Sequence, residues 1–221
     1  MAPIRVALEI GPKRTFAVAL DWPGWARSGR TEEEALANLA AYAPRYAASV
    51  REPGLAEAAG YDVVERLTGG SGTDFGVPSA TATTDNEPLD PAELDRQQRL
   101  LRAAWSAFDA AARAAAGHAL RTGPRGGGRG LEKMTLHVLE AEEGYLTQLG
   151  RRRPKPPAAD LAGRMTQVRN AALEALAARA HGEDPPDASQ VRKRWTPRYF
   201  VRRSAWHALD HAWELEDRVL P

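Results

Sequence analysis

The sequence contains no cysteine among its 221 residues. This absence excludes disulfide bonds, thiolate metal ligands and a cysteine nucleophile, so any thiol chemistry must use a thiol from outside the chain. The sequence also lacks an apolar run close to the roughly 20 residues that a bilayer-spanning helix requires. We therefore expect no membrane span.

Charge of one sign is not in excess either, since the formal net charge is +1 at pH 7. A nearly neutral chain has no global positive field to attract a nucleic-acid backbone, although the run Arg151-Arg152-Arg153 is locally basic. We expect no nucleic-acid partner. Charged residues near the N-terminus interrupt any apolar core of a secretory signal, so we expect a cytoplasmic protein. These residues are Arg5, Glu9, Lys13 and Arg14.

The first part of the chain predicts strands and one helix. Residues 4–20 predict a β-hairpin, because two apolar runs are separated by a Gly-Pro turn. Thr31 followed by Glu34 predicts a capping box at the start of a helix, which is expected to kink or restart at Pro44. Residues 61–67 predict a further strand.

A polar stretch before residue 90 is the best candidate for a domain boundary. Asp90 is a suitable N-cap and Pro91 a suitable first helical residue, so a helix is expected to begin there. Beyond it the pattern changes from strands with one helix to helices throughout. We predict a small α/β module at residues 1–80, a linker at 81–90 and a helical domain at 91–221.

Helical segments are expected at about residues 91–116, 131–149, 158–180 and 197–220. Helices of about 20 residues with short or medium connections predict an antiparallel four-helix bundle with one core. The predicted fold class is therefore α+β, in which a small β-β-(β)-α-β module precedes the bundle.

The stretch WHALDHAWELEDR places His207 and His211 four residues apart on the last predicted helix. Two imidazoles at that spacing can converge on one metal ion, but the spacing is also typical of two unrelated, half-buried histidines. His137 favours the metal, because it lies beside the apolar stripe of the second predicted helix. A bundle can assemble a three-nitrogen site from one histidine of that helix and the pair. His118 and His181 fall at predicted helix ends and are interpreted as exposed or capping residues.

These residues resemble a known family. LHVLEAEEGYLTQLG and RRSAWHALDHAWELEDR are similar to the DinB-like (YfiT-like) four-helix bundle superfamily, over about residues 90–221. The resemblance implies that His137, His207 and His211 bind a divalent metal. It also implies a transferase or isomerase that uses a small cellular thiol, although many members have no assigned reaction.

Three imidazoles would leave open positions on Zn²⁺ or Ni²⁺ for water, a thiol or a substrate oxygen. Together with the resemblance, such a site implies a metal-dependent thiol transferase, isomerase or hydrolase that acts on a small molecule. Glu214 and Glu140, each three residues beyond a histidine, are candidates for orienting an imidazole or relaying a proton; alternatively both are solvated carboxylates. Arg203 is a candidate for contact with an anionic substrate, with a surface role as the alternative.

The stretch from Phe16 to Asn38, with its Asp-Trp-Pro-Gly turn, resembles the HicB-like antitoxin domain, and the likeness covers about residues 4–68. No DNA-binding helix-turn-helix or ribbon follows, so an antitoxin role is the third hypothesis. We expect an interaction, dimerisation or pocket-covering element, and a homodimer would follow from an exposed sheet edge. The second hypothesis is a binding or regulatory protein whose HicB-like module engages a partner and whose metal is structural or absent.

Overall fold

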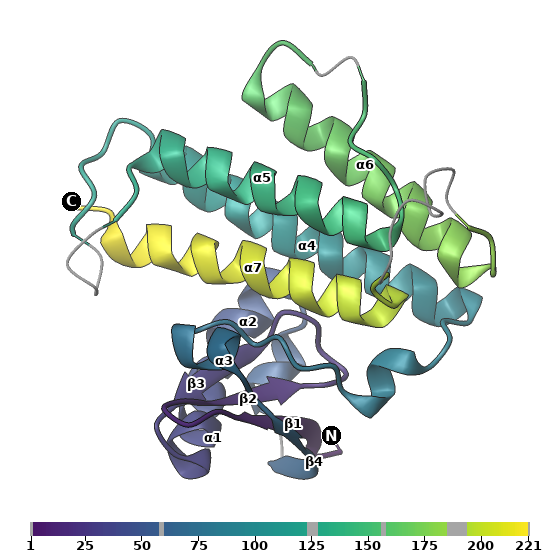
Figure 1. Ribbon diagram of the computed structural model, residues 1–221. Coiled ribbons are helices and arrows are strands. Elements are labelled where there is room, and N and C mark those ends of the chain that lie inside the picture. Colours follow the sequence, from purple (N-terminus) through teal and green to yellow (C-terminus); the bar gives the residue numbers. More distant parts are fainter. Residues whose placement is uncertain (1, 58–59, 123–127, 156–157, 185–193, 221) are drawn as a thin grey trace.

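The computed structural model describes residues 2–57, 60–122, 128–155, 158–184 and 194–220. Its fold is α+β, with an N-terminal mixed sheet followed by long helices (Figure 1). Parts of the loops predicted before residues 131 and 197, and of the proline-rich connector after Arg153, lie outside the described residues. Within the described residues, no helix combines the length and apolar character that a membrane crossing demands.

The sheet contains four strands in the described residues, in the order β3-β2-β1-β4. β1 pairs antiparallel with β2, β2 pairs antiparallel with β3, and β1 pairs parallel with β4. The predicted hairpin and the strand near residues 61–67 are therefore confirmed. The strands are β1 (Ile4–Ile10), β2 (Thr15–Ala19), β3 (Ala26–Gly29) and β4 (Tyr61–Thr68).

Two consecutive helices, α1 (Glu32–Ala41) and α2 (Ala43–Val50), follow β3. The predicted N-cap is present, because Thr31 Oγ1 accepts from the Glu34 backbone N–H at 3.2 Å. The reciprocal bond of the predicted capping box is not formed: the Glu34 carboxylate accepts from the Arg30 N–H at 2.8 Å and not from that of Thr31. The predicted restart is also confirmed, because Pro44 occupies the first turn of α2, where no intrahelical donor is needed.

The long helices of the second part are α4 (Pro91–Ala115), α5 (Leu131–Leu149), α6 (Leu161–Ala180) and α7 (Pro197–Arg218). Their ends follow local chemistry: Asp90 and Thr196 cap α4 and α7, and Gly150 ends α5 in the left-handed conformation that glycine adopts readily. The first turn expected before Leu161 does not form, because Asp160 is the N-cap and accepts from Gly163 at 2.7 Å.

Figure 1 shows α4, α5 and α7 alongside one another, with the N-terminal end of α6 splayed away from them. α7 packs on α4 and α5, and α6 packs mainly on α5. A buried ion network links three of these helices, since Arg169 of α6 contacts Glu142 of α5 at 3.0 Å and Asp109 of α4 at 2.9 Å. The four helices therefore share contacts, and α5 and α7 face each other where the histidines lie.

The segment between β4 and α4 includes the predicted linker at residues 81–90 and carries two short elements. It forms a short helix, α3 (Ser71–Phe75), and a 3-10 turn over Thr83–Asn86. It is also anchored on α7, because the buried Arg202 guanidinium contacts the buried Asp85 carboxylate, with Nε and Oδ1 3.1 Å apart, and Tyr199 donates to the Ser79 carbonyl at 2.9 Å.

The N-terminal module and the long helices share one hydrophobic core. Gly24 lies so close to α7 that a Cβ atom there would be 2.8 Å from Leu209 Cδ1 and 3.1 Å from the Ala205 backbone. Arg27 of β3 forms an ion pair with Asp210 of α7 at 3.1 Å. The sheet therefore covers one flank of α7 (Figure 1). The boundaries at residues 80 and 90 stay a prediction.

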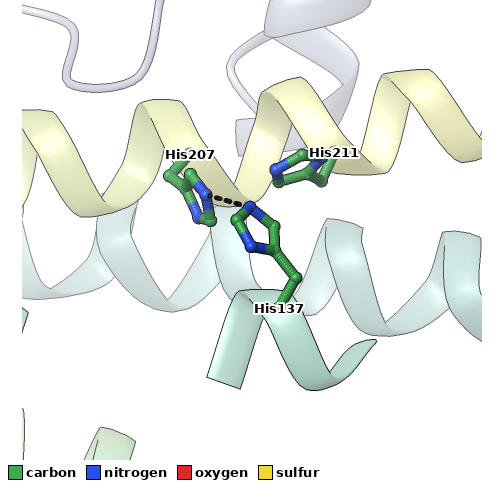
Figure 2. Close-up of side chains that lie close together, drawn as sticks. All are labelled: His137, His207 and His211. Atoms are coloured by element: carbon green, nitrogen blue, oxygen red, sulfur yellow. Dashed lines mark hydrogen bonds between the residues drawn. The ribbon is translucent and has the colours of Figure 1, made fainter. Parts of the chain in front are cut away.

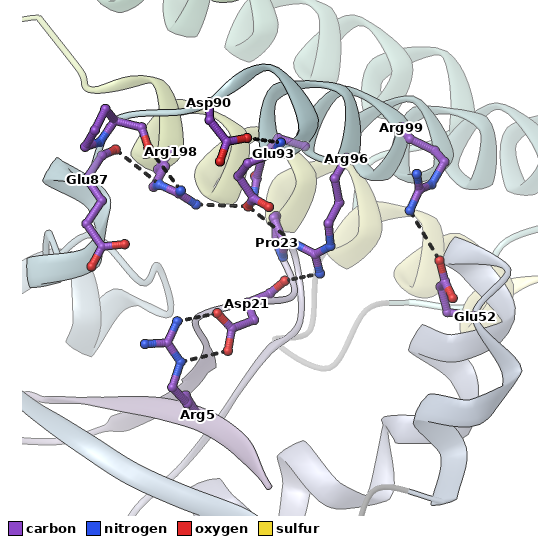
Figure 3. A network of polar contacts seen from close by, with 12 residues as sticks. Arg5, Asp21, Pro23, Glu52, Glu87, Asp90, Glu93, Arg96, Arg99 and Arg198 are labelled. Atoms are coloured by element: carbon purple, nitrogen blue, oxygen red, sulfur yellow. Dashed lines mark hydrogen bonds and ion pairs between the residues drawn. The ribbon is translucent and has the colours of Figure 1, made fainter. Parts of the chain in front are cut away.

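Polar contacts join the module to α4 as well (Figure 3). Arg96 donates to the Asp21 carbonyl at 2.6 Å, and the Asp21 carboxylate in turn contacts Arg5 of β1. Arg99 lies 3.6 Å from Glu52, just beyond α2. Because the exposed ion pairs among these contribute little to stability, we assign the attachment mainly to the shared apolar core.

Candidate metal centre

Three histidines from two helices converge at one point. His137 extends from α5, and His207 and His211 extend from adjacent turns of α7 (Figure 2). One ring nitrogen from each histidine lies within 4.8 Å of one from each of the others. The Nε2 atoms of His137 and His207 are 3.3 Å apart. The cluster is the only group of this kind in the described part of the chain, and it contains the residues expected from the sequence.

The rings are arranged around a common centre rather than stacked. The His207 and His211 centroids are 4.5 Å apart with an interplanar angle of 84°, and His137 lies 5.2 Å and 5.0 Å from the two rings. Apolar residues on the opposite side of α7, such as Ala205 and Leu209, are buried in the core. That packing fixes the rotation of α7 and therefore directs both histidines towards α5.

Burial keeps two of the imidazoles neutral near pH 7. Burial, reinforced by neighbouring His211, lowers the pKa of His137 to about 4. The pKa of His207 is lowered well below its ordinary value, again chiefly by burial, and only 7% of this residue is exposed. A neutral imidazole has a free lone pair on one nitrogen, which is the form that binds a metal.

Glu214 orients the third ring. Its Oε2 lies 3.1 Å from Nδ1 of His211, and its Oε1 accepts from Arg218 at 2.8 Å. Arg218 is itself held by the Arg121 carbonyl at 2.8 Å. The hydrogen bond to His211 is the largest cause of the lowered pKa of Glu214. With Nδ1 engaged by a carboxylate, Nε2 of His211 is left for a ligand, which is a common arrangement around metal-binding histidines.

The other candidate residues lie in different surroundings. The Glu140 side chain is exposed on α5 and makes no hydrogen bond or ion pair within the described residues, in agreement with the solvated alternative. Glu214 contacts His211 and also forms the i,i+4 ion pair with Arg218. Arg203 is half-buried beside aromatic rings, and His118 and His181 are exposed.

Tyr145, Trp195 and Tyr199 form an aromatic group that borders the cluster, and sequence reasoning missed its two tyrosines. Tyr145 of α5 meets the His207 ring edge-on at 5.6 Å, and the Trp195 ring lies 5.1 Å from Tyr145 and 4.9 Å from Tyr199. Tyr145 follows His137 by eight residues, about two helical turns, which is the signal that could have placed it near the same face. Trp195 contacts both tyrosines and therefore lies beside the cluster's surroundings.

The donor set fits a divalent ion. Three imidazole nitrogens without thiolates or carboxylates suit Zn²⁺, Ni²⁺ and similar ions, and burial favours the neutral, ligand-competent form of His137 and His207. No protein-family model, curated protein or solved structure matches this chain. What the site can do is therefore inferred from its own residues.

Proposed function

We propose that His137, His207 and His211 bind one divalent metal ion and that the chain is a metal-dependent enzyme of the DinB-like type. In this proposal α4, α5, α6 and α7 are the counterpart of the DinB-like four-helix bundle. The observation that carries the proposal is the convergence of three ligand nitrogens within 4.8 Å of one another, from helices far apart in the sequence. Half-buried histidines without a shared role are not expected to bring three ring nitrogens together in this way.

The metal, Zn²⁺ or Ni²⁺, would lower the pKa of a bound thiol or water enough to give a nucleophile near neutral pH. The chain's own groups have separate tasks. Glu214 holds the His211 ring through Nδ1, and burial keeps His207 neutral. The substrate would be a small molecule, and a small cellular thiol would supply the nucleophile in a transferase or isomerase, whereas water would do so in a hydrolase.

Metal analysis of untagged protein tests this proposal. We expect about one metal ion per chain in the wild type, with loss of most of it in His137→Ala, His207→Ala and His211→Ala. The exposed histidines provide matched controls, so His118→Ala and His181→Ala should keep the wild-type content. Wild-type protein without stoichiometric metal after exposure to Zn²⁺ and Ni²⁺ would overturn the proposal. A screen with small thiols and electrophiles then tests activity, and no turnover with metal bound would leave a binding role.

The second candidate is a binding or regulatory protein that acts through the HicB-like module. The observation in its favour is the position of β4 at one edge of the sheet, where, within the described residues, it pairs only with β1. An unpaired edge can accept a strand from another chain, including a second copy. Light scattering coupled to size exclusion measures this: a concentration-dependent dimer supports the candidate, and a monomer at all concentrations without a captured partner counts against it.

A further inference from the structure

Arg203 has an unusual electrostatic environment. It lies on α7 one turn before His207, on the same side of the helix. Its Nη1 atom is buried and has no hydrogen-bond partner, and the residue forms no ion pair within the described ranges. Leaving a buried charged donor without a partner costs more than leaving a neutral one, so such an atom calls for an explanation.

Neighbouring arginines on the same helix are satisfied. Arg198 contacts the Glu93 carboxylate at 2.9 Å, and Arg202 contacts the buried Asp85 carboxylate. Arg203 lacks the acidic partner that these two arginines have.

Aromatic rings hold the Arg203 guanidinium next to the histidine cluster. Its Cζ atom lies 5.4 Å from the Tyr145 ring centroid and 4.6 Å from that of Trp206. The Tyr145 ring also contacts the His207 ring at 5.6 Å. Arg203 is therefore held in place with one aromatic ring between it and the proposed metal ligands. Because the side chain is already ordered, a ligand that binds it loses little free energy to ordering it.

Two carboxylates that lie further along the same side of α7 are already occupied. Glu214 contacts His211 and Arg218, and Asp210 contacts Arg27. The described part of the chain thus leaves Arg203 without an acidic partner, and a partner from outside the chain would supply the missing charge.

We propose that Arg203 binds the carboxylate of a small ligand whose other end reaches the three histidines. This inference rests on the proposed function and names its substrate class, namely a small carboxylate-bearing molecule or thiol. A planar guanidinium can donate two parallel hydrogen bonds to a carboxylate, a geometry that a point charge does not match.

Two thiols of equal length test the proposal on Co²⁺-loaded protein, because visible absorption reports thiol binding at the metal. We expect the wild type to bind mercaptoacetate roughly 10- to 100-fold more tightly than uncharged 2-mercaptoethanol. Arg203→Gln should lose this preference while still binding 2-mercaptoethanol, and Arg203→Lys should keep part of it. Arg102→Gln, which removes the same charge from an exposed position on α4, should retain the wild-type preference.

An unchanged preference in Arg203→Gln would overturn this inference and leave the metal proposal intact. Absence of Co²⁺ binding would instead overturn the proposed function. In that case the role of Arg203 is tested by ligand titration of the metal-free protein. In that form the Arg203 Nε–H resonance should shift saturably with acetate but not with acetamide, and the Arg102 resonance should not move. No shift with acetate would overturn the inference.

Discussion

The Nε2 atoms of His137 and His207 lie 3.3 Å apart although the two residues are separated by 70 positions in the sequence. At this distance two N–H groups would point at each other and repel. At most one of the two Nε2 atoms therefore carries a proton, and the other presents its lone pair. A metal ion would replace that proton and bind both lone pairs. The stability of the fold is therefore expected to depend on metal.

Zn²⁺ should stabilise the metal-free wild type against thermal unfolding. At a free Zn²⁺ concentration about 100 times the Kd, mass action gives about 2.7 kcal/mol of added stability. His207→Ala should show little of this gain, and the exposed variant His118→Ala should show all of it. Calorimetry with and without Zn²⁺ measures the difference, and equal gains in the two variants would contradict the assignment of the ligands.

Glu214→Gln should weaken metal binding by roughly 10- to 100-fold, because the amide replaces the carboxylate that orients the His211 ring. Competition with a chelator of known affinity gives the Kd. Glu216→Gln is the matched control, since Glu216 is an exposed carboxylate two residues away that pairs with Arg45 instead. The interpretation fails if both variants lose affinity equally.

The metal-free protein should become less stable as the pH falls from about 6.5 to about 4. The pKa of His137 is lowered from 6.5 to about 4 in the folded chain, so in this window the unfolded chain binds a proton that the folded chain does not. Above pH 6.5 both states are neutral at this residue and it contributes nothing. Urea midpoints measured across the window should therefore fall less steeply in His137→Gln than in the wild type, and identical slopes would refute the prediction.

Much of the helical part could be predicted because its signals are local. Asp90 and Thr196 are caps and Gly150 is a stop, and each acts on residues within one turn. The histidine set could be predicted for a similar reason: the spacing of His207 and His211 fixes a shared face, and His137 lies beside the buried stripe of its helix.

The segment between β4 and α4 could not be predicted in the same way. Its short helix and 3-10 turn have no apolar periodicity, and distant partners stabilise them. Asp85 contacts Arg202, which is 117 positions away, and the backbone N–H groups of Ser79 and Ala80 donate to the buried Glu9. The surroundings of Arg203 depend on tertiary contacts too, since Tyr145 comes from another helix.

Arg169→Ala should destabilise the protein by about 3–5 kcal/mol, because it leaves the buried Glu142 carboxylate without its cation. Arg164→Ala is a control on the same helix whose ion pair with Glu143 is more exposed, and it should cost about 1 kcal/mol or less. Chemical denaturation of both variants gives the comparison. A double variant with Arg169→Met and Glu142→Leu should recover much of the loss.

Gly24→Ala should destabilise the whole chain by about 1–3 kcal/mol, because Gly24 has a φ of 94° and its added Cβ would meet α7. Gly144→Ala in α5 should instead stabilise the chain by about 0.5–1 kcal/mol, since nothing beyond the adjoining helix backbone lies within 4 Å of its Cβ position. Global unfolding monitored by circular dichroism distinguishes the two. Equal stability of both variants would show that the Gly24 contact is unimportant.

The close approach of Gly24 to α7 also limits how genetic recombination could rearrange such a chain. A chimera that kept residues 91–221 and received a foreign N-terminal domain would need an equally small residue opposite Ala205 and Leu209. It would also need a cation in place of Arg27 to match Asp210. The two parts are therefore expected to be inherited as a pair, with compatible changes on both sides of α7.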